Sequence, residues 1–143
     1  MKIKQKIKDA HELVSSTILP NDLQRLISNR IIAAIIIICV CVFASIALKT
    51  ISFMIGAILS LYLILIAYKL RYDYAKGYIH EYTLSCISTK QTRQNTNVVF
   101  LDDNEKNHVF IYPSKKNLFF ENVKYTIYTH NQNEKVIIAF EEV

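Results

Sequence analysis

The sequence predicts an α+β membrane protein: an N-terminal amphipathic helix, a two-helix transmembrane hairpin, then a small five-stranded antiparallel β-barrel or sheet of OB or SH3-like type. Apolar residues make up 52% of the 143 residues but gather between residues 31 and 70. Basic residues flank that block, and short runs rich in β-branched and aromatic residues follow it. The expected parts are a basic amphipathic juxtamembrane region at 1–30, transmembrane helices at 31–48 and 51–70, the second extending to about 76, and a β-domain at 78–143.

The apolar block consists of two runs of similar length, IIAAIIIICVCVFASIAL and ISFMIGAILSLYLILIAYKL. Each is about long enough to cross roughly 30 Å of hydrocarbon at 1.5 Å per residue. Neither run has the polar stripe of a soluble amphipathic helix. A signal peptide is a poor alternative, because the first run starts after thirty residues and a second follows at once.

Lys49 separates the two runs and decides how they are connected. A single helix over residues 31–68 would be about 57 Å long, nearly twice the hydrocarbon thickness. It would also hold a lysine near its midpoint, which costs roughly 2.5 to 3.5 kcal/mol on insertion scales. We therefore expect a hairpin in which Lys49 and Thr50 form a tight turn at the far interface.

The basic residues near the helix ends predict the orientation of this hairpin. Five of them lie on the side of the chain termini: Arg25, Arg30, Lys69, Arg71 and Lys76. Only Lys49 lies at the opposite end. The positive-inside rule then places both termini in the cytoplasm, with the lipid bilayer as the first partner. The cysteines at 39, 41 and 86 form no disulfide framework or zinc motif, which fits a reducing compartment.

Small residues predict how the two spans pack against each other. Antiparallel pairing about the turn sets Gly56 opposite about Ala44 and Ser60 opposite about Cys39. Small side chains in register let two backbones approach closely, so Ala44, Gly56 and Ser60 are the expected packing face. The alternative is that Gly56 is merely tolerated.

The first thirty residues predict an amphipathic helix lying on the inner leaflet. Lysines surround the apolar side of this helix. The apolar residues recur at helical spacing: Ile3, Ile7, Ala10 and Val14. Pro20 ends this helix, and Asn21 or Asp22 can cap a second, short helix. A basic leader that only helps to set the orientation is the alternative.

Short strand-like runs at hairpin spacing follow Gly77, a natural helix stop. The expected strands are 78–89, 96–101, 108–112, 123–129 and 135–142. Polar, turn-rich segments separate them. Five short antiparallel strands in about sixty-five residues predict a small barrel or strongly twisted sheet, because closure also hides the sheet edges.

The order of these parts resembles a known layout. The chain resembles small uncharacterised membrane proteins of Gram-positive bacteria with a C-terminal cytoplasmic β-domain. The resemblance rests on the order of its parts: two spans, a strand ending in cysteine (YTLSCIST), an acidic hairpin (VVFLDDNEKNHVFIY), a lysine-rich bend (PSKKNLFFENVKY) and a closing strand (VIIAFEE). More distantly the layout is similar to that of NfeD-like proteins, whose OB-fold follows membrane helices. The resemblance implies a bacterial cell membrane and carries over no catalytic residue.

The residues predict no enzyme of a recognisable class and no cofactor. His80 and Cys86 share a face of one strand but lie about 20 Å apart, too far for a nucleophile and base pair. The acidic segment 102–108 lacks the glycine and final glutamate of a calcium loop, so we interpret it as a solvated hairpin tip rather than a metal site. Phosphate-cradling loops, GxSxG and HExxH are absent from the sequence.

The aromatic residues between 110 and 128 superficially match a stacking surface for single-stranded nucleic acid. However, residues 69–143 carry ten basic and nine acidic residues, too small an excess for phosphate binding. The bend is the exception, because two adjacent aromatics in an extended segment cannot both point inward. Its candidate contacts with a partner protein or lipid are Lys115, Lys116, Phe119 and Phe120.

These observations predict a membrane-anchored binding or scaffolding module that presents a cytoplasmic β-domain to another membrane protein or complex. The alternative is a small immunity or membrane-stress-protection protein that acts through its transmembrane hairpin. A second copy of the chain is another possible partner, and nucleic acid is not expected.

Overall fold

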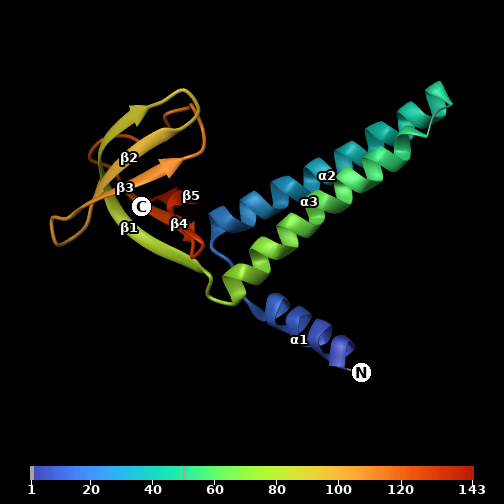
Figure 1. Cartoon of the computed structure of the whole chain (residues 1–143), viewed down its shortest axis with the longest axis horizontal. Coiled ribbons are helices and arrows are strands. Elements are labelled where there is room, and N and C mark those ends of the chain that lie inside the picture. The colour runs from blue at the N-terminus through green and yellow to red at the C-terminus, as the bar shows by residue number, and fades with distance from the viewer. Residues whose placement is uncertain (1, 50) are drawn as a thin grey trace. The chain divides into compact units, whose positions relative to one another are not determined.

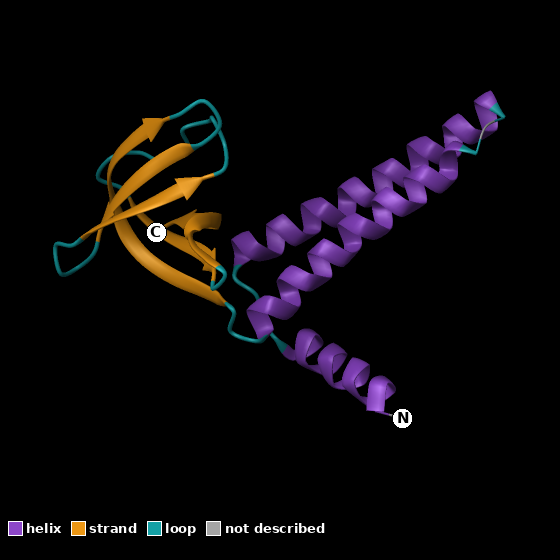
Figure 2. Ribbon diagram, in the orientation of Figure 1, coloured by secondary structure: helices purple, strands orange, loops and turns teal. Residues whose placement is uncertain are grey.

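A computed structural model describes residues 2–49 and 51–143, with only the backbone described at Lys2 and Ser52. The chain divides into two compact units, Met1–Lys76 and Gly77–Val143. The described residues of the first unit form three helices, and the strands are confined to the second unit (Figure 1 and Figure 2). The two units are therefore an all-helical unit and a β unit, which agrees with the predicted α+β layout.

The helical unit consists of α1 (Lys2–Ser16), α2 (Asn21–Leu48) and α3 (Ser52–Ala75). Helices α2 and α3 run antiparallel and lie side by side along their length (Figure 1). Both are long and apolar enough to span a membrane. The 28 residues of α2 extend about 42 Å at 1.5 Å per residue, so α2 exceeds the roughly 30 Å thickness of the hydrocarbon by about two turns.

Helix α2 begins ten residues before the predicted first span. The prediction of a separate short helix after Pro20 is therefore wrong. Pro20 is the N-cap residue, and its carbonyl accepts the Gln24 N–H at 2.9 Å, without a side-chain cap from Asn21 or Asp22. The segment 21–30 contains neither glycine nor proline, so nothing interrupts the hydrogen-bond ladder before the apolar run. The polar and apolar segments therefore form one rigid rod.

Lys49 ends α2 in the left-handed conformation, with φ 50°, and its N–H donates to the carbonyl of Ser45. A left-handed residue at the end of a helix satisfies one of the last carbonyls and reverses the chain. The predicted turn is formed at Lys49, while Thr50 lies outside the described residues. Helix α3 then starts at Ser52.

The β unit is a ring of five strands: β1 (Ile79–Gln91), β2 (Thr96–Leu101), β3 (Asn107–Tyr112), β4 (Lys124–His130) and β5 (Asn133–Glu142). Neighbouring strands follow the order β1-β2-β3-β5-β4, and β4 returns to pair with β1. The long β1 makes closure possible, because its first half pairs with β4 and its second half with β2. A register shift between Cys86 and Ser88 marks the change of partner.

All five predicted strands are present, within two residues at each end. The expected purely antiparallel arrangement is wrong at one position, because β3 and β5 pair in parallel through Ile111 and Val136. The ring is therefore a mixed sheet. Local sequence pattern specifies strands and hairpins, whereas this pairing joins segments separated by the whole of β4.

The core of the ring consists of side chains that alternate inward along the strands. Its buried members are Leu84, Cys86, Val98, Phe100, Phe110, Phe119, Tyr125, Ile127 and Ile137. Aromatic rings meet edge to face within it, as Phe100 and Phe110 do at 5.8 Å. This packing fixes the positions of the loops that the outer surface presents.

Candidate functional sites

Gly56 is buried where α2 and α3 pack together. A Cβ atom placed on Gly56 would lie 2.5 Å from Cys41 Cβ and 2.6 Å from Cys41 Sγ, closer than real carbon atoms approach. The absence of a side chain at Gly56 therefore permits the close approach of the two helices. Sequence reasoning predicted Ala44 opposite this glycine, whereas the structure places Cys41 there.

Ser60 is also buried at this interface, and its Oγ donates a hydrogen bond to the Ala34 carbonyl at 2.8 Å. The predicted neighbour, Cys39, is an exposed residue instead. Ala44 is half-buried. The predicted register assumed a constant pairing about a two-residue turn, whereas the actual partner is displaced by three residues at Gly56 (Cys41 for Ala44) and by five at Ser60 (Ala34 for Cys39), which is about one helical turn.

The basic residues used to predict orientation lie near the open end of the hairpin. Arg25 and Arg30 lie on the first three turns of α2, and Lys69 and Arg71 on the last two turns of α3. Lys49 lies at the opposite end and is exposed. Arg71 differs from the other four, because its Nε is buried and the residue lines a cavity.

The bend between β3 and β4 separates two adjacent aromatic side chains. Phe119 is 2% exposed, and its ring lies 4.4 Å from Phe140, 5.2 Å from Tyr125 and 5.4 Å from Tyr112 between ring centroids. Phe120 is 66% exposed. The prediction that Phe119 contacts a partner or lipid is therefore wrong, since that side chain is the centre of the aromatic core.

Three hydrogen bonds hold the bend against β1. The Asn122 N–H donates to the Cys86 carbonyl at 2.8 Å, and the Cys86 N–H donates to the Val123 carbonyl at 2.9 Å. The Asn117 Nδ2 donates to Thr89 Oγ1 at 2.9 Å. Asn122 adopts the left-handed conformation, with φ 65°, which asparagine tolerates better than most residues. The bend is thus fixed at both of its ends.

We give the name Phe120 patch to the three exposed apolar residues of this bend and the adjoining part of β1: Ile87, Leu118 and Phe120. Ile87 lies on β1 between Cys86 and Thr89, the residues to which the bend is bonded. Lys115 and Lys116, both exposed, precede the patch in the same bend. Exposed Glu121 follows Phe120 directly, so the bend carries charges of both signs, with two lysines against one glutamate.

The tip of the β2–β3 hairpin is organised by Asp102. Its Oδ1 accepts the N–H groups of Asn104 at 2.8 Å and Lys106 at 2.9 Å, and its Oδ2 accepts from His108 Nε2 at 3.0 Å. These hydrogen bonds lower the pKa of Asp102 below its ordinary value, and the bond from His108 has the largest effect. Within residues 2–49 and 51–143, no three His, Cys, Asp or Glu side chains gather as metal ligands.

Cys86 is 1% exposed and belongs to the core of the ring. Burial, with a smaller effect of the Glu121 carboxylate, raises the pKa of its thiol above the ordinary value. A nucleophilic cysteine needs the opposite shift, because the thiolate is the reactive form. The position of Cys86 is structural.

Comparison of the chain with family models, with curated protein sequences and with solved structures found no match. The arguments for function therefore depend on the surfaces described above.

Proposed function

We propose that this protein is a membrane-anchored binding module. In this proposal α2 and α3 form a two-span hairpin in a bacterial cell membrane, and the β unit is displayed in the cytoplasm. The Phe120 patch contacts another membrane protein. The observation that carries the proposal is the exposure of Phe120 on a bend that hydrogen bonds fix to the ring.

The membrane orientation is supported by the distribution of basic residues along the hairpin. Arg25, Arg30, Lys69 and Arg71 lie near the open end, and Lys49 lies at the closed end. Lysine and arginine near span ends are retained on the cytoplasmic side during insertion. Both termini, and the β unit with them, are then cytoplasmic.

We further infer that the ring is an OB-type barrel rather than an SH3-like one. The support is its connectivity, in which β1, β2 and β3 follow one another and β5 lies between β3 and β4. OB-folds are five-stranded Greek-key barrels of this kind. NfeD-like proteins, which the sequence distantly resembles in layout, also have membrane helices followed by an OB-type domain.

A protein suits the β unit better than nucleic acid as a partner. Residues 77–143 contain seven Lys and Arg against eight Asp and Glu, so no positive field surrounds the ring. The aromatic rings that would stack on bases are instead buried, notably Phe100, Phe110 and Phe119. What remains exposed is a small apolar patch.

The chemistry of the Phe120 patch indicates the kind of protein surface that would fit it. Interfaces combine a central aromatic or aliphatic anchor with a polar rim. Here Phe120 is the anchor, and Lys115 and Lys116 supply a basic rim. The complementary surface has an apolar pocket with acidic residues beside it.

Site-specific photo-crosslinking in living cells tests this proposal. A benzoyl-phenylalanine residue is introduced at Leu118, within the patch, and in separate variants at Val109 on β3 and at Tyr62 on α3, both exposed. We expect one discrete crosslinked protein from Leu118. Adding Phe120→Glu should lower its yield at least about tenfold, because a central anchor contributes roughly 2 kcal/mol or more.

The control variant is Val109→Glu, which places the same charge on an exposed apolar residue of the same unit. It should leave the crosslink from Leu118 unchanged. Crosslinks obtained only from Tyr62 would contradict the proposal and support an immunity or stress-protection protein that acts through its spans. Capture of a second copy from Leu118 would show that the partner is the chain itself.

A further inference from the structure

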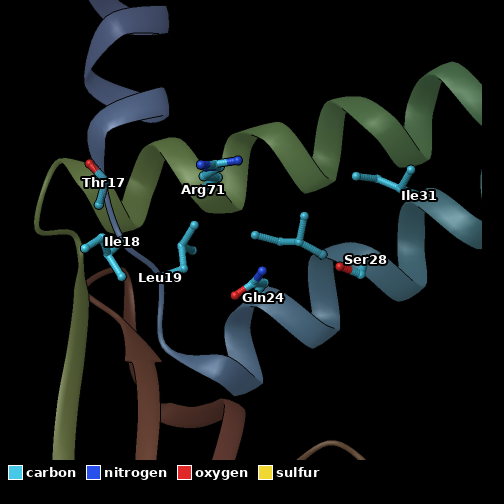
Figure 3. A pocket seen from close by; sticks show the side chains of 8 residues that line it. Thr17, Ile18, Leu19, Gln24, Ser28, Ile31 and Arg71 are labelled. Carbon is cyan, nitrogen blue, oxygen red and sulfur yellow. The ribbon is translucent and has the colours of Figure 1, made fainter.

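A cavity of about 360 Å³ lies at the open end of the hairpin, next to Arg71. Figure 3 shows Arg71 on α3 across the cavity from Gln24 and Ser28 on α2, with Thr17, Ile18 and Leu19 of the α1–α2 link closing one side. All of these residues belong to the helical unit. The cavity therefore has a polar lining that three segments share.

A second cavity of about 320 Å³ shares Arg71, Ile27 and Ile31 with the first. Most of its surface is apolar, and its further lining consists of Val14, Ile64 and Ala67 together with His11, Ser15 and Tyr68. Arg71 thus borders a polar compartment on one side and an apolar compartment on the other. An amphipathic ligand fits this pair, with its head in the first cavity and the start of its tail in the second.

The guanidinium group of Arg71 has unused hydrogen-bonding capacity. Its Nε is buried and has no hydrogen-bond partner among the described residues. None of the ion pairs found in that part of the chain includes Arg71. Because the buried Nε is closed off from the cavity, a ligand would meet the terminal nitrogens, Nη1 and Nη2, whose planar arrangement can bind two oxygens of a phosphate group through parallel hydrogen bonds.

Two of the three other polar groups of the first cavity suit the same ligand. Gln24 and Ser28 lie one turn apart on α2 and supply an amide and a hydroxyl donor. The Thr17 hydroxyl already donates to the Leu13 carbonyl at 2.7 Å, so its oxygen can only accept. No carboxylate lines either cavity, so no negatively charged side chain would touch a bound anion and a cationic headgroup would find no partner there.

The depth of Arg71 along α3 agrees with a lipid headgroup. Arg71 lies four residues before the end of the helix at Ala75, just past the apolar run, with the basic residue Lys69 beside it. In a membrane-spanning hairpin this level coincides with the phosphates of one leaflet. The exposed lysines of α1 would also raise the local concentration of anionic lipid.

We propose that the Arg71 cavity binds the phosphate of an anionic phospholipid, with the adjoining cavity holding the first part of an acyl chain. The inference rests on the membrane insertion in the proposed function and is independent of the partner of the Phe120 patch. Phosphate is the chemistry that Arg71 recognises, and a lipid and free inorganic phosphate are its two possible sources.

Native mass spectrometry of the full-length protein in neutral detergent tests the inference. The probes are phosphatidylglycerol, phosphatidylcholine and inorganic phosphate, each added separately, and phosphate added in competition with phosphatidylglycerol. We expect one phosphatidylglycerol to bind about tenfold more tightly than phosphatidylcholine, since a charge-assisted hydrogen bond is worth at least that factor. Millimolar phosphate should not displace it.

Arg71→Gln should remove this preference, lowering phosphatidylglycerol binding about tenfold. Arg71→Lys should retain part of it, because an ammonium group cannot form the paired hydrogen bonds. The matched control is Lys69→Gln, which removes the same charge from an exposed position two residues away and should bind as the natural protein does. Ser28→Leu fills the cavity without changing any charge and should also lower binding, which provides a second test if Arg71→Gln fails to fold.

Equal losses in Arg71→Gln and Lys69→Gln would overturn the inference, because they would show a general surface charge effect. Unchanged binding in both Arg71→Gln and Ser28→Leu would do the same. Displacement of the lipid by millimolar phosphate would assign the site to the free anion. Failure of membrane insertion would appear separately, as a protein that remains soluble without detergent.

Discussion

At the scale of single residues, Phe119 and Phe120 differ in surroundings although they are neighbours in the chain. Phe119 contacts four aromatic rings in the core, whereas Phe120 is exposed. The sequence indicates that the two cannot share one environment but does not indicate which is buried. Alternation applies to strands, and the bend is irregular, so hydrogen bonds to Cys86 and Thr89 decide the outcome.

Replacing each of these phenylalanines by alanine should therefore affect stability very differently. Phe119→Ala leaves a void among aromatic rings and should lower the free energy of unfolding of the β unit by about 3 to 5 kcal/mol. Phe120→Ala should change it by no more than about 0.5 kcal/mol. Urea unfolding of the detergent-solubilised full chain, followed by near-ultraviolet circular dichroism of the tyrosines, measures both values. A loss at Phe120 as large as that at Phe119 would show that Phe120 belongs to the core.

At the scale of elements, the existence of the two long helices and of five strands follows from the sequence, but their pairing does not. Apolar length predicts the helices, and runs of β-branched and aromatic residues between turns predict the strands. The register of α2 against α3 depends on the turn after Lys49 and on Ser60 bonding to Ala34, neither of which local pattern specifies. The parallel contact between β3 and β5 is likewise a long-range pairing.

The contact between Gly56 and Cys41 gives the sharpest test of the helix pairing. Gly56→Ala places a methyl group 2.5 Å from Cys41 Cβ, so it should separate the helices at a cost of about 1 to 3 kcal/mol. Cys41→Gly in the same chain removes the clash and should restore most of the loss. Unfolding of the protein in mixed micelles with increasing sodium dodecyl sulfate measures the effect.

The matched control for that experiment is Ala57→Val, which adds methyl groups at the exposed residue next to Gly56. Its unfolding should resemble that of the natural protein. If Gly56→Ala also unfolds at the same fraction of dodecyl sulfate as the natural protein, then the glycine is merely tolerated and the helices do not pack at this point.

At the scale of the whole molecule, the proposed activity depends on which side of the membrane the β unit occupies. Helix length and composition support insertion, and the basic residues at the open end support cytoplasmic termini. The Arg71 cavity was missed by sequence reasoning because the first span was expected to begin at Ile31. Its lining also depends on the α1–α2 link and on the register of α2 against α3, which local sequence pattern does not specify.

Cysteine labelling of intact cells tests the central claim, a hairpin that displays its β unit in the cytoplasm. Cys39, Cys41 and Cys86 are replaced by alanine, and single cysteines are introduced as Ile51→Cys beside the closed end of the hairpin and as Arg93→Cys in the β1–β2 loop, both at exposed positions. Lys49 is left in place, so the charge distribution that sets the orientation is preserved at the closed end. The account predicts that a membrane-impermeant maleimide labels position 51 in intact cells and position 93 only after the cells are permeabilised. Labelling of position 93 in intact cells would contradict it.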